Sequence, residues 1–152
     1  MKDITFELVT NEDIEELTAV SVRSFHSDIN HGAEILKGPP GYDSVDFHRE
    51  MLKESSCFYK ILSNREIIGG FWFMKQENEA AYLYRIFLDP GYHRKGIGLR
   101  ALNFLRGTFP EIKVWRLKTP KWNTRTQKFY VKAGFKISEI ADRFNFYEKR
   151  MN

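Results

Sequence analysis

The chain has 152 residues, of which 42% are hydrophobic, 15% aromatic and 29% charged, a composition typical of a soluble globular protein with one core. Its net charge of +4 favours anionic ligands but does not distinguish a phosphorylated cofactor from nucleic acid or acidic lipid. A single cysteine, Cys57, excludes an intrachain disulfide and a cysteine-built zinc site. The sequence contains neither a signal-like nor a membrane-spanning apolar run, so it predicts a cytoplasmic protein.

Hydrophobic periodicity predicts that strands and helices alternate along the chain. The segment IIGGFWFM, residues 67–74, is apolar throughout, which indicates a strand covered on both faces and therefore a mixed α/β fold. The predicted strands are 4–9, 58–62, 67–74, 82–88, 114–118, 135–140 and 144–149; the predicted helices begin after Thr10 or Asn11, near Val45, at Gly96 and at Asn123.

The longest connection covers residues 26–42 and contains glycines, prolines and at most a short helical piece at 33–36. Connections of this length are uncommon unless they are functional. The Pro39-Pro40 pair stiffens the backbone, and Tyr42 offers an aromatic surface. We interpret this part of the connection as a lid or wall of a ligand site; the alternative is an ordinary surface turn.

The most informative segment is LDPGYHRKGIGLRAL, residues 88–102, in which a strand is followed by a basic loop and a helix that opens on Gly96 and Gly98. Glycines let an anion approach the backbone, and free N–H groups at a helix start favour a pyrophosphate. The alternative is a tight turn beside a solvated basic loop. A P-loop is excluded because its GxxxxGK motif is absent, and a Rossmann site is disfavoured because Lys118 stands where an acidic residue is needed.

A second segment, NTRTQKFYVKAGF, places Asn123 at a helix start, Tyr130 two turns later and Gly134-Phe135 at the exit. Taken with His93-Arg94-Lys95-Gly96-Ile97-Gly98, this pattern resembles the two signatures of the GNAT superfamily of acetyl-CoA-dependent N-acetyltransferases. The sequence departs from them at His93, where a longer donor is usual, and at Thr126, where alanine is usual.

The resemblance implies an α/β fold of GNAT type over a single N-acetyltransferase domain, residues 1–152. Its mixed, mostly antiparallel sheet of about seven strands is flanked by about four helices and splayed between the fourth and fifth strands. The resemblance also implies acetyl-CoA (coenzyme A) as acetyl-donor cosubstrate, no metal, and a small-molecule or peptide amine as acceptor. We expect a monomer or homodimer, with neither nucleic acid nor membrane as a partner.

The resemblance assigns roles to residues in both segments. Tyr130 is the implied general acid, because a neutral phenol can protonate the departing thiolate, and a backbone N–H at Phe87 or Leu88 is the implied oxyanion contact. Leu88 is therefore the second catalytic residue. The implied cofactor-binding residues are Ile86, Phe87, Leu88, His93, Arg94, Lys95, Gly96, Ile97, Gly98, Leu99, Asn123 and Tyr130.

The acceptor side is less well defined by the sequence. Its implied lining residues are His31, Pro40, Tyr42 and Tyr84. The general base stays open among Glu79, Tyr84, a histidine and a water relay, because the fourth strand carries Tyr82, Tyr84 and Arg85 where a glutamate is usual. This missing base motivates the alternative function, a non-catalytic acyl-CoA sensor or interaction module.

Overall fold

A computed structural model of the protein describes residues 3–28 and 38–151. The expected helical piece at 33–36 and the expected acceptor residue His31 lie outside them. The elements are β1 (Ile4–Leu8), η1 (Asn11–Asp13), α1 (Ile14–His26), α2 (Val45–Glu54), β2 (Cys57–Ser63), β3 (Glu66–Gln76), β4 (Ala80–Leu88), η3 (Pro90–Tyr92), α3 (Ile97–Thr108), β5 (Val114–Pro120), α4 (Thr124–Lys132), β6 (Lys136–Ile140) and β7 (Phe144–Arg150).

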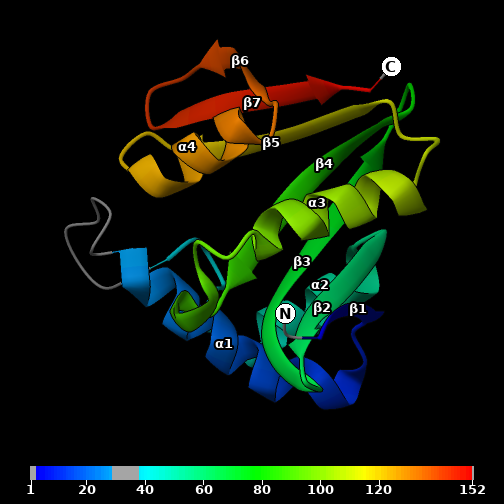
Figure 1. Cartoon of the computed structure of the whole chain (residues 1–152), viewed down its shortest axis with the longest axis vertical. Coiled ribbons are helices and arrows are strands. Elements are labelled where there is room, and N and C mark those ends of the chain that lie inside the picture. The colour runs from blue at the N-terminus through cyan, green and yellow to red at the C-terminus, as the bar shows by residue number, and fades with distance from the viewer. Residues whose placement is uncertain (1–2, 29–37, 152) are drawn as a thin grey trace.

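The seven strands form one sheet in the order β1-β2-β3-β4-β5-β7-β6, and every pair is antiparallel except β4 with β5. The parallel pairing covers only three positions, from Ala80 opposite Val114 to Tyr82 opposite Arg116. Beyond them the two strands diverge, as Figure 1 shows, and no strand within residues 3–28 and 38–151 pairs with the rest of β4 on that side. The predicted splay between the fourth and fifth strands is therefore confirmed.

The helices cover the two faces of this sheet with separate apolar cores. On one face α3 and α4 pack on side chains that include Phe71, Phe73 and Leu117. On the other, α1 and α2 pack on side chains that include Trp72 and Phe87. Alternation along β3 supplies both cores, which confirms the two-faced burial predicted for this strand. In Figure 1, α3 crosses in front of β3 and β4, and α4 lies against the end of the sheet formed by β5, β7 and β6.

The polar residues at the helix starts explain where the helices begin. The Ser44 side chain caps α2 by accepting the Phe47 N–H at 3.0 Å, and Asn123 caps α4 by accepting the Thr126 N–H at 3.1 Å. At the start of α3, Gly96 adopts a left-handed conformation with φ +76°. None of the described helices is long and apolar enough to cross a membrane.

Candidate functional site

The unpaired side of β4 presents backbone groups to the region where the sheet splays. The Asp89 N–H donates to Ile68 O of β3 at 2.7 Å. Because backbone groups of successive strand residues point to opposite edges, the N–H groups of Leu88 and Ile86 point away from β3. They face the side on which β4 has lost its pairing with β5. We call this side of β4, from Leu83 to Leu88, the open edge.

The Leu88 N–H has a side-chain partner from α1. It donates to Ser24 Oγ at 3.2 Å, and Ser24 is 2% exposed. Ser24 was not among the predicted site residues. Only its place near the end of an amphipathic helix is visible in the sequence, and its contact with β4 depends on how α1 packs across the sheet.

The start of α3 lies just beyond the open edge, after the basic loop. Gly96 is exposed, and a Cβ added to it would meet no atom of the described residues within 4 Å. The first N–H groups of α3 have no partner within their own helix, and the helix dipole adds a partial positive charge there. The surroundings of Gly96 therefore fit an anion that approaches the backbone closely, as the sequence predicts.

At Gly98 a packing contact, rather than open space, explains why the residue is glycine. A Cβ at this position would lie 3.0 Å from two ring carbons of Phe129 on α4. The absence of a side chain at Gly98 thus lets the start of α3 pack closely against Phe129 of α4. From the sequence, both glycines were expected to let an anion approach the backbone, and the contact with Phe129 adds a packing role that the spacing did not reveal.

A hydrogen bond connects the basic loop to the end of the strand that precedes it. His93 donates from Nε2 to Leu88 O at 2.9 Å, so this ring fixes the turn at the end of β4. Arg94 has a positive φ of 64°, and both Arg94 and Lys95 are exposed. The exposed side chains of Arg94 and Lys95 thus lie just before the start of α3, where they can reach an anion. His93 instead stabilises the turn through its hydrogen bond to Leu88 O.

Tyr130 lies buried on α4, with its ring among Phe129, Phe135 and Tyr147. Burial raises the pKa of its phenol well above the usual range; Arg125 acts against this shift and Tyr82 adds to it.

Tyr82 is the last residue of β4 that pairs with β5, and burial raises its pKa to about 12. The phenol of Tyr130 thus interacts with a residue at the point where the strands diverge.

An ion pair connects the helices of the two faces. Arg125 Nη2 on α4 lies 3.0 Å from Oδ1 of Asp28, which follows α1, and the Asp28 side chain is 4% exposed. Since α1 and α4 lie on opposite faces of the sheet, this pair links the faces beside the splay. Neither residue was predicted as functional, because their separation of 97 positions carries no sequence signal.

Three of the expected acceptor residues, Pro40, Tyr42 and Tyr84, lie within the described residues, on the α1 and α2 face. Tyr42 Oη lies 2.8 Å from His26 Nε2, and Pro40 O accepts from Arg85 Nη2 at 3.0 Å. Tyr84 is 41% exposed and stacks on Trp72, with ring centroids 5.6 Å apart. The structure thus brings Pro40, Tyr42 and Tyr84 to one region around Arg85.

Glu79 lies elsewhere. It occupies the turn between β3 and β4 with a φ of 59°, and its backbone carbonyl accepts from the N–H groups of Lys113 and Val114. It therefore precedes the paired end of β4, at the opposite end of the strand from Leu88. This geometry disfavours Glu79 among the candidate bases.

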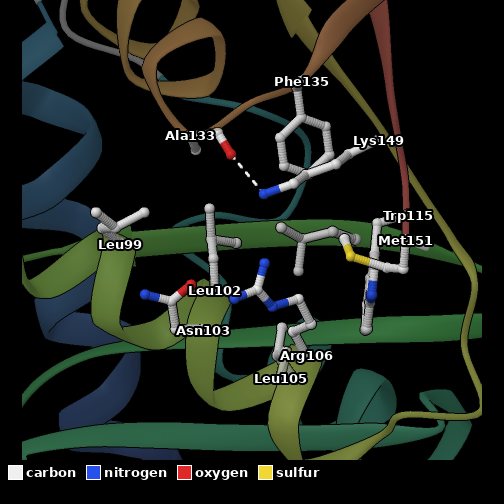
Figure 2. Close-up of a pocket in the computed structure, with 11 residues that line it drawn as sticks. Leu99, Leu102, Asn103, Leu105, Arg106, Trp115, Ala133, Phe135, Lys149 and Met151 are labelled. Atoms are coloured by element: carbon white, nitrogen blue, oxygen red, sulfur yellow. Dashed lines mark hydrogen bonds between the residues drawn. The ribbon is translucent and has the colours of Figure 1, made fainter.

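Figure 2 shows a separate hollow on the α3 and α4 face, between α3 and the strands β5 and β7. Lys149 donates to Ala133 O at 2.7 Å beside it, and burial together with Arg106 lowers the pKa of Lys149. Leu99 is its one lining residue among the predicted cofactor residues. Leu83, at one end of the open edge, also lines the hollow, whereas Leu88 and Gly96 do not. Within residues 3–28 and 38–151, no cluster of His, Cys, Asp or Glu could hold a metal ion.

The splayed sheet, the helix start at Gly96 and the order of elements define an acetyltransferase of GNAT type, and comparison with known families agrees. Residues 22–135 match the acetyltransferase (GNAT) family, so the chain belongs to it. Membership of this family makes the protein an acyltransferase.

Individual relatives are distant. The chain is 27% identical over 140 residues to the uncharacterized protein YrkN of Bacillus subtilis, covering 90% of this chain and 75% of the relative. It is 25% identical over 135 residues to the uncharacterized N-acetyltransferase Rv2669 of Mycobacterium tuberculosis, with coverages of 83% and 85%. Among solved structures, the PaiA N-acetyltransferase of Thermoplasma acidophilum in complex with coenzyme A has a TM-score of 0.81 at 20% identity, covering 98% and 99% of the two chains.

Proposed function

We propose that this protein transfers the acetyl group of acetyl-CoA directly to a primary amine of a small molecule, peptide or lysine in a ternary complex. The observation that carries the proposal is the open edge of β4, which ends beside an accessible helix start at Gly96. An unpaired strand edge can accept an extended ligand as an added strand, and a helix start can bind its phosphates.

The donor is held by backbone groups in this proposal. The first turn of α3 and the exposed side chains of Arg94 and Lys95 bind the diphosphate, while the N–H groups of Ile86 and Leu88 receive the pantetheine arm and the acetyl carbonyl. Ser24 Oγ must then give up the Leu88 N–H, which it accepts at 3.2 Å. Asn123 contributes by capping α4 and so orienting Tyr130.

Tyr130 acts as the general acid. Acetyl-CoA supplies an activated thioester, whose thiolate needs a proton when the amine displaces it. The buried phenol is neutral at pH 7, since its pKa is raised from a normal value near 10. The amine must also lose a proton. Because Glu79 lies at the far end of β4 from Leu88, this proton leaves through a chain of water molecules past the exposed Tyr84 in the proposed mechanism.

Release of free thiol tests this function. The full-length protein is incubated with acetyl-CoA and a panel of primary amines, and the thiol is measured over time against a sample without protein. We expect amine-dependent release with at least one acceptor. A protein that binds coenzyme A but releases no thiol above background with any amine would instead be the sensor module.

A further inference from the structure

Arg85 is the most deeply buried arginine on the acceptor side, and it lies among aromatic rings. It is 8% exposed, and its Cζ lies 5.2 Å from the ring centre of Phe47, 5.3 Å from Trp72, 5.6 Å from Tyr84 and 5.9 Å from Phe25. Such rings stabilise a cation through their faces. They provide no negative charge, however, and a guanidinium removed from water normally needs one.

The described residues offer Arg85 no carboxylate within ion-pair distance. Nη2 donates to Pro40 O at 3.0 Å, while Nη1 is buried and has no hydrogen-bond partner among the described residues. The indole Nε1 of Trp72 is also buried and finds no partner in the part of the chain that the structure describes. Trp72 lies directly opposite Arg85 in the pairing of β3 with β4, so two unsatisfied N–H donors belong to neighbouring residues.

His48 completes the polar group without adding charge. Its Nδ1 donates to Ser44 O at 2.8 Å and also lies 3.0 Å from Thr18 Oγ1. Nε2 is therefore a buried acceptor, and none of the described residues donates to it. Burial is the main cause that lowers the pKa of this imidazole, and nearby Arg85 lowers it further. The hydrogen bond to the Ser44 carbonyl and the charge of Asp43 raise the pKa but do not cancel this shift. With His48 neutral, Arg85 gives this buried region one uncompensated positive charge.

A β-bulge directs Arg85 to this face. Trp72 pairs with Arg85, but Phe73 pairs with Leu83, so Tyr84 is an extra residue in β4. Tyr84 and Arg85 consequently both lie on the Trp72 side of the sheet, the face covered by α1 and α2. Arg85 is only three positions from Leu88, a separation of roughly 10 Å along a strand.

We propose that Arg85 and Trp72 form an anion subsite for the acceptor, which is therefore an amine that carries a carboxylate or phosphate group a few bonds from its nitrogen. The inference rests on the proposed function and specifies its substrate class. The planar guanidinium donates from Nη1 and the indole from Nε1, a donor set suited to an anionic oxygen. The exposed ring of Tyr84 or the Pro40 segment moves aside to admit the ligand.

The test compares amines that differ only in the anionic group: β-alanine with 3-aminopropanol, and O-phosphoethanolamine with ethanolamine. Both kcat/KM and calorimetric binding to the coenzyme A complex are measured on the full-length protein. We expect wild type to favour one or both anionic members by at least about tenfold, the range of hydrogen bonds to charged groups. Arg85→Met should abolish that preference without changing the affinity for coenzyme A.

Controls separate this inference from the proposed function. Arg49→Met removes an arginine from α2 that has no part in the subsite and should keep the preference; Arg85→Lys, which retains the charge, should keep part of it and serves if Arg85→Met fails to fold. Equal wild-type binding of anionic and neutral partners would overturn the subsite, whether or not acetylation occurs. Selective binding of an anionic amine without thiol release would contradict the proposed reaction while supporting the subsite.

Discussion

The two faces of the sheet recognise their ligands by different means in this account. On the α3 and α4 face, the proposed donor contacts are backbone groups at the start of a helix and along the open edge of β4. On the α1 and α2 face, the acceptor meets buried side chains, above all Arg85, Trp72 and His48. Backbone recognition needs only glycine and strand geometry, whereas side-chain recognition can change with single residues. Single substitutions could therefore change acceptor recognition while the donor contacts stay the same.

The largest expected effect comes from Tyr130→Phe, which removes the proposed acid from the donor side. We expect kcat to fall about 100-fold, within the usual range for general acid catalysis, with little change in the affinity for coenzyme A. Because burial raises the pKa of Tyr130, the wild-type acid stays protonated throughout the neutral and mildly alkaline range. Its deprotonation therefore should not lower kcat as the pH rises from 7 to 9.

Tyr147→Phe is the matched control for this variant. Tyr147 is 1% exposed, its ring centre lies 6.4 Å from that of Tyr130, and its hydroxyl donates to Gln127 Oε1 at 3.2 Å. Losing this phenol should cost some stability and leave kcat nearly unchanged. The kcat of both variants and of wild type is measured by steady-state kinetics. An unchanged kcat in Tyr130→Phe would show that Tyr130 is not the general acid.

Gly96→Ala probes the backbone side of the comparison. A left-handed φ of +76° penalises alanine by roughly 1–2 kcal/mol of stability, and the new Cβ points into space that the protein leaves open. We expect about a tenfold loss of affinity for coenzyme A, measured by calorimetry. Gly107→Ala in the same helix is the control, because its new Cβ also has no atom of the described residues within 4 Å. This variant should raise the free energy of unfolding by about 0.5–1 kcal/mol and leave the affinity for coenzyme A unchanged. Equal affinities of both variants and wild type would remove Gly96 from the donor site.

A third prediction concerns His48 on the acceptor face. Its lowered folded-state pKa means that the unfolded chain binds a proton that the folded protein resists. The free energy of unfolding should therefore decrease as the pH falls below the unfolded value near 6.5, by at most about 1.4 kcal/mol per pH unit until the folded-state pKa is reached.

Denaturant melts between pH 7.5 and 5 measure this slope. His48→Phe should flatten it, whereas His26→Phe, which removes a half-buried imidazole that contacts Tyr42, should leave the contribution of His48 in place. An identical slope in His48→Phe and wild type would show that the buried imidazole does not govern it.

The smallest expected effect belongs to Ser24→Ala, where the two faces meet. Without Ser24 Oγ, the Leu88 N–H loses the partner that competes with the donor. We expect stability to fall by about 1 kcal/mol and coenzyme A to bind up to about fivefold more tightly. Ser27→Ala, whose hydroxyl donates to Ser24 O at 2.6 Å, leaves the Leu88 contact in place and should not tighten binding. Weaker binding by Ser24→Ala would mean that the hydroxyl assists the donor.

The sequence was sufficient for the fold because the fold depends largely on local patterns, and the proposed donor residues come from local motifs as well. Apolar periodicity predicted all seven strands, although β4 begins at Ala80 rather than Tyr82 because its pairing with β3 and β5 continues toward the turn. Asn123 was expected to cap its helix, and it does so. Family membership and the enzyme class, both implied by the two signatures, are confirmed.

The acceptor side could not be predicted in the same way. Strict alternation along β4 would place Arg85 on the same face as Ala81 and Leu83, and the bulge at Tyr84 reverses this. The contact of Ser24 with Leu88 spans 64 positions and depends on the packing of α1. These are tertiary effects that leave no periodic trace in the chain.

A backbone amide NMR titration with coenzyme A tests the central claim most directly, because it reads the N–H groups themselves. We predict the largest shift changes at the start of α3, at Gly96, Ile97 and Gly98, and at Ile86 and Leu88 of β4. Saturable binding with its largest changes elsewhere, or no changes at millimolar coenzyme A, would contradict it.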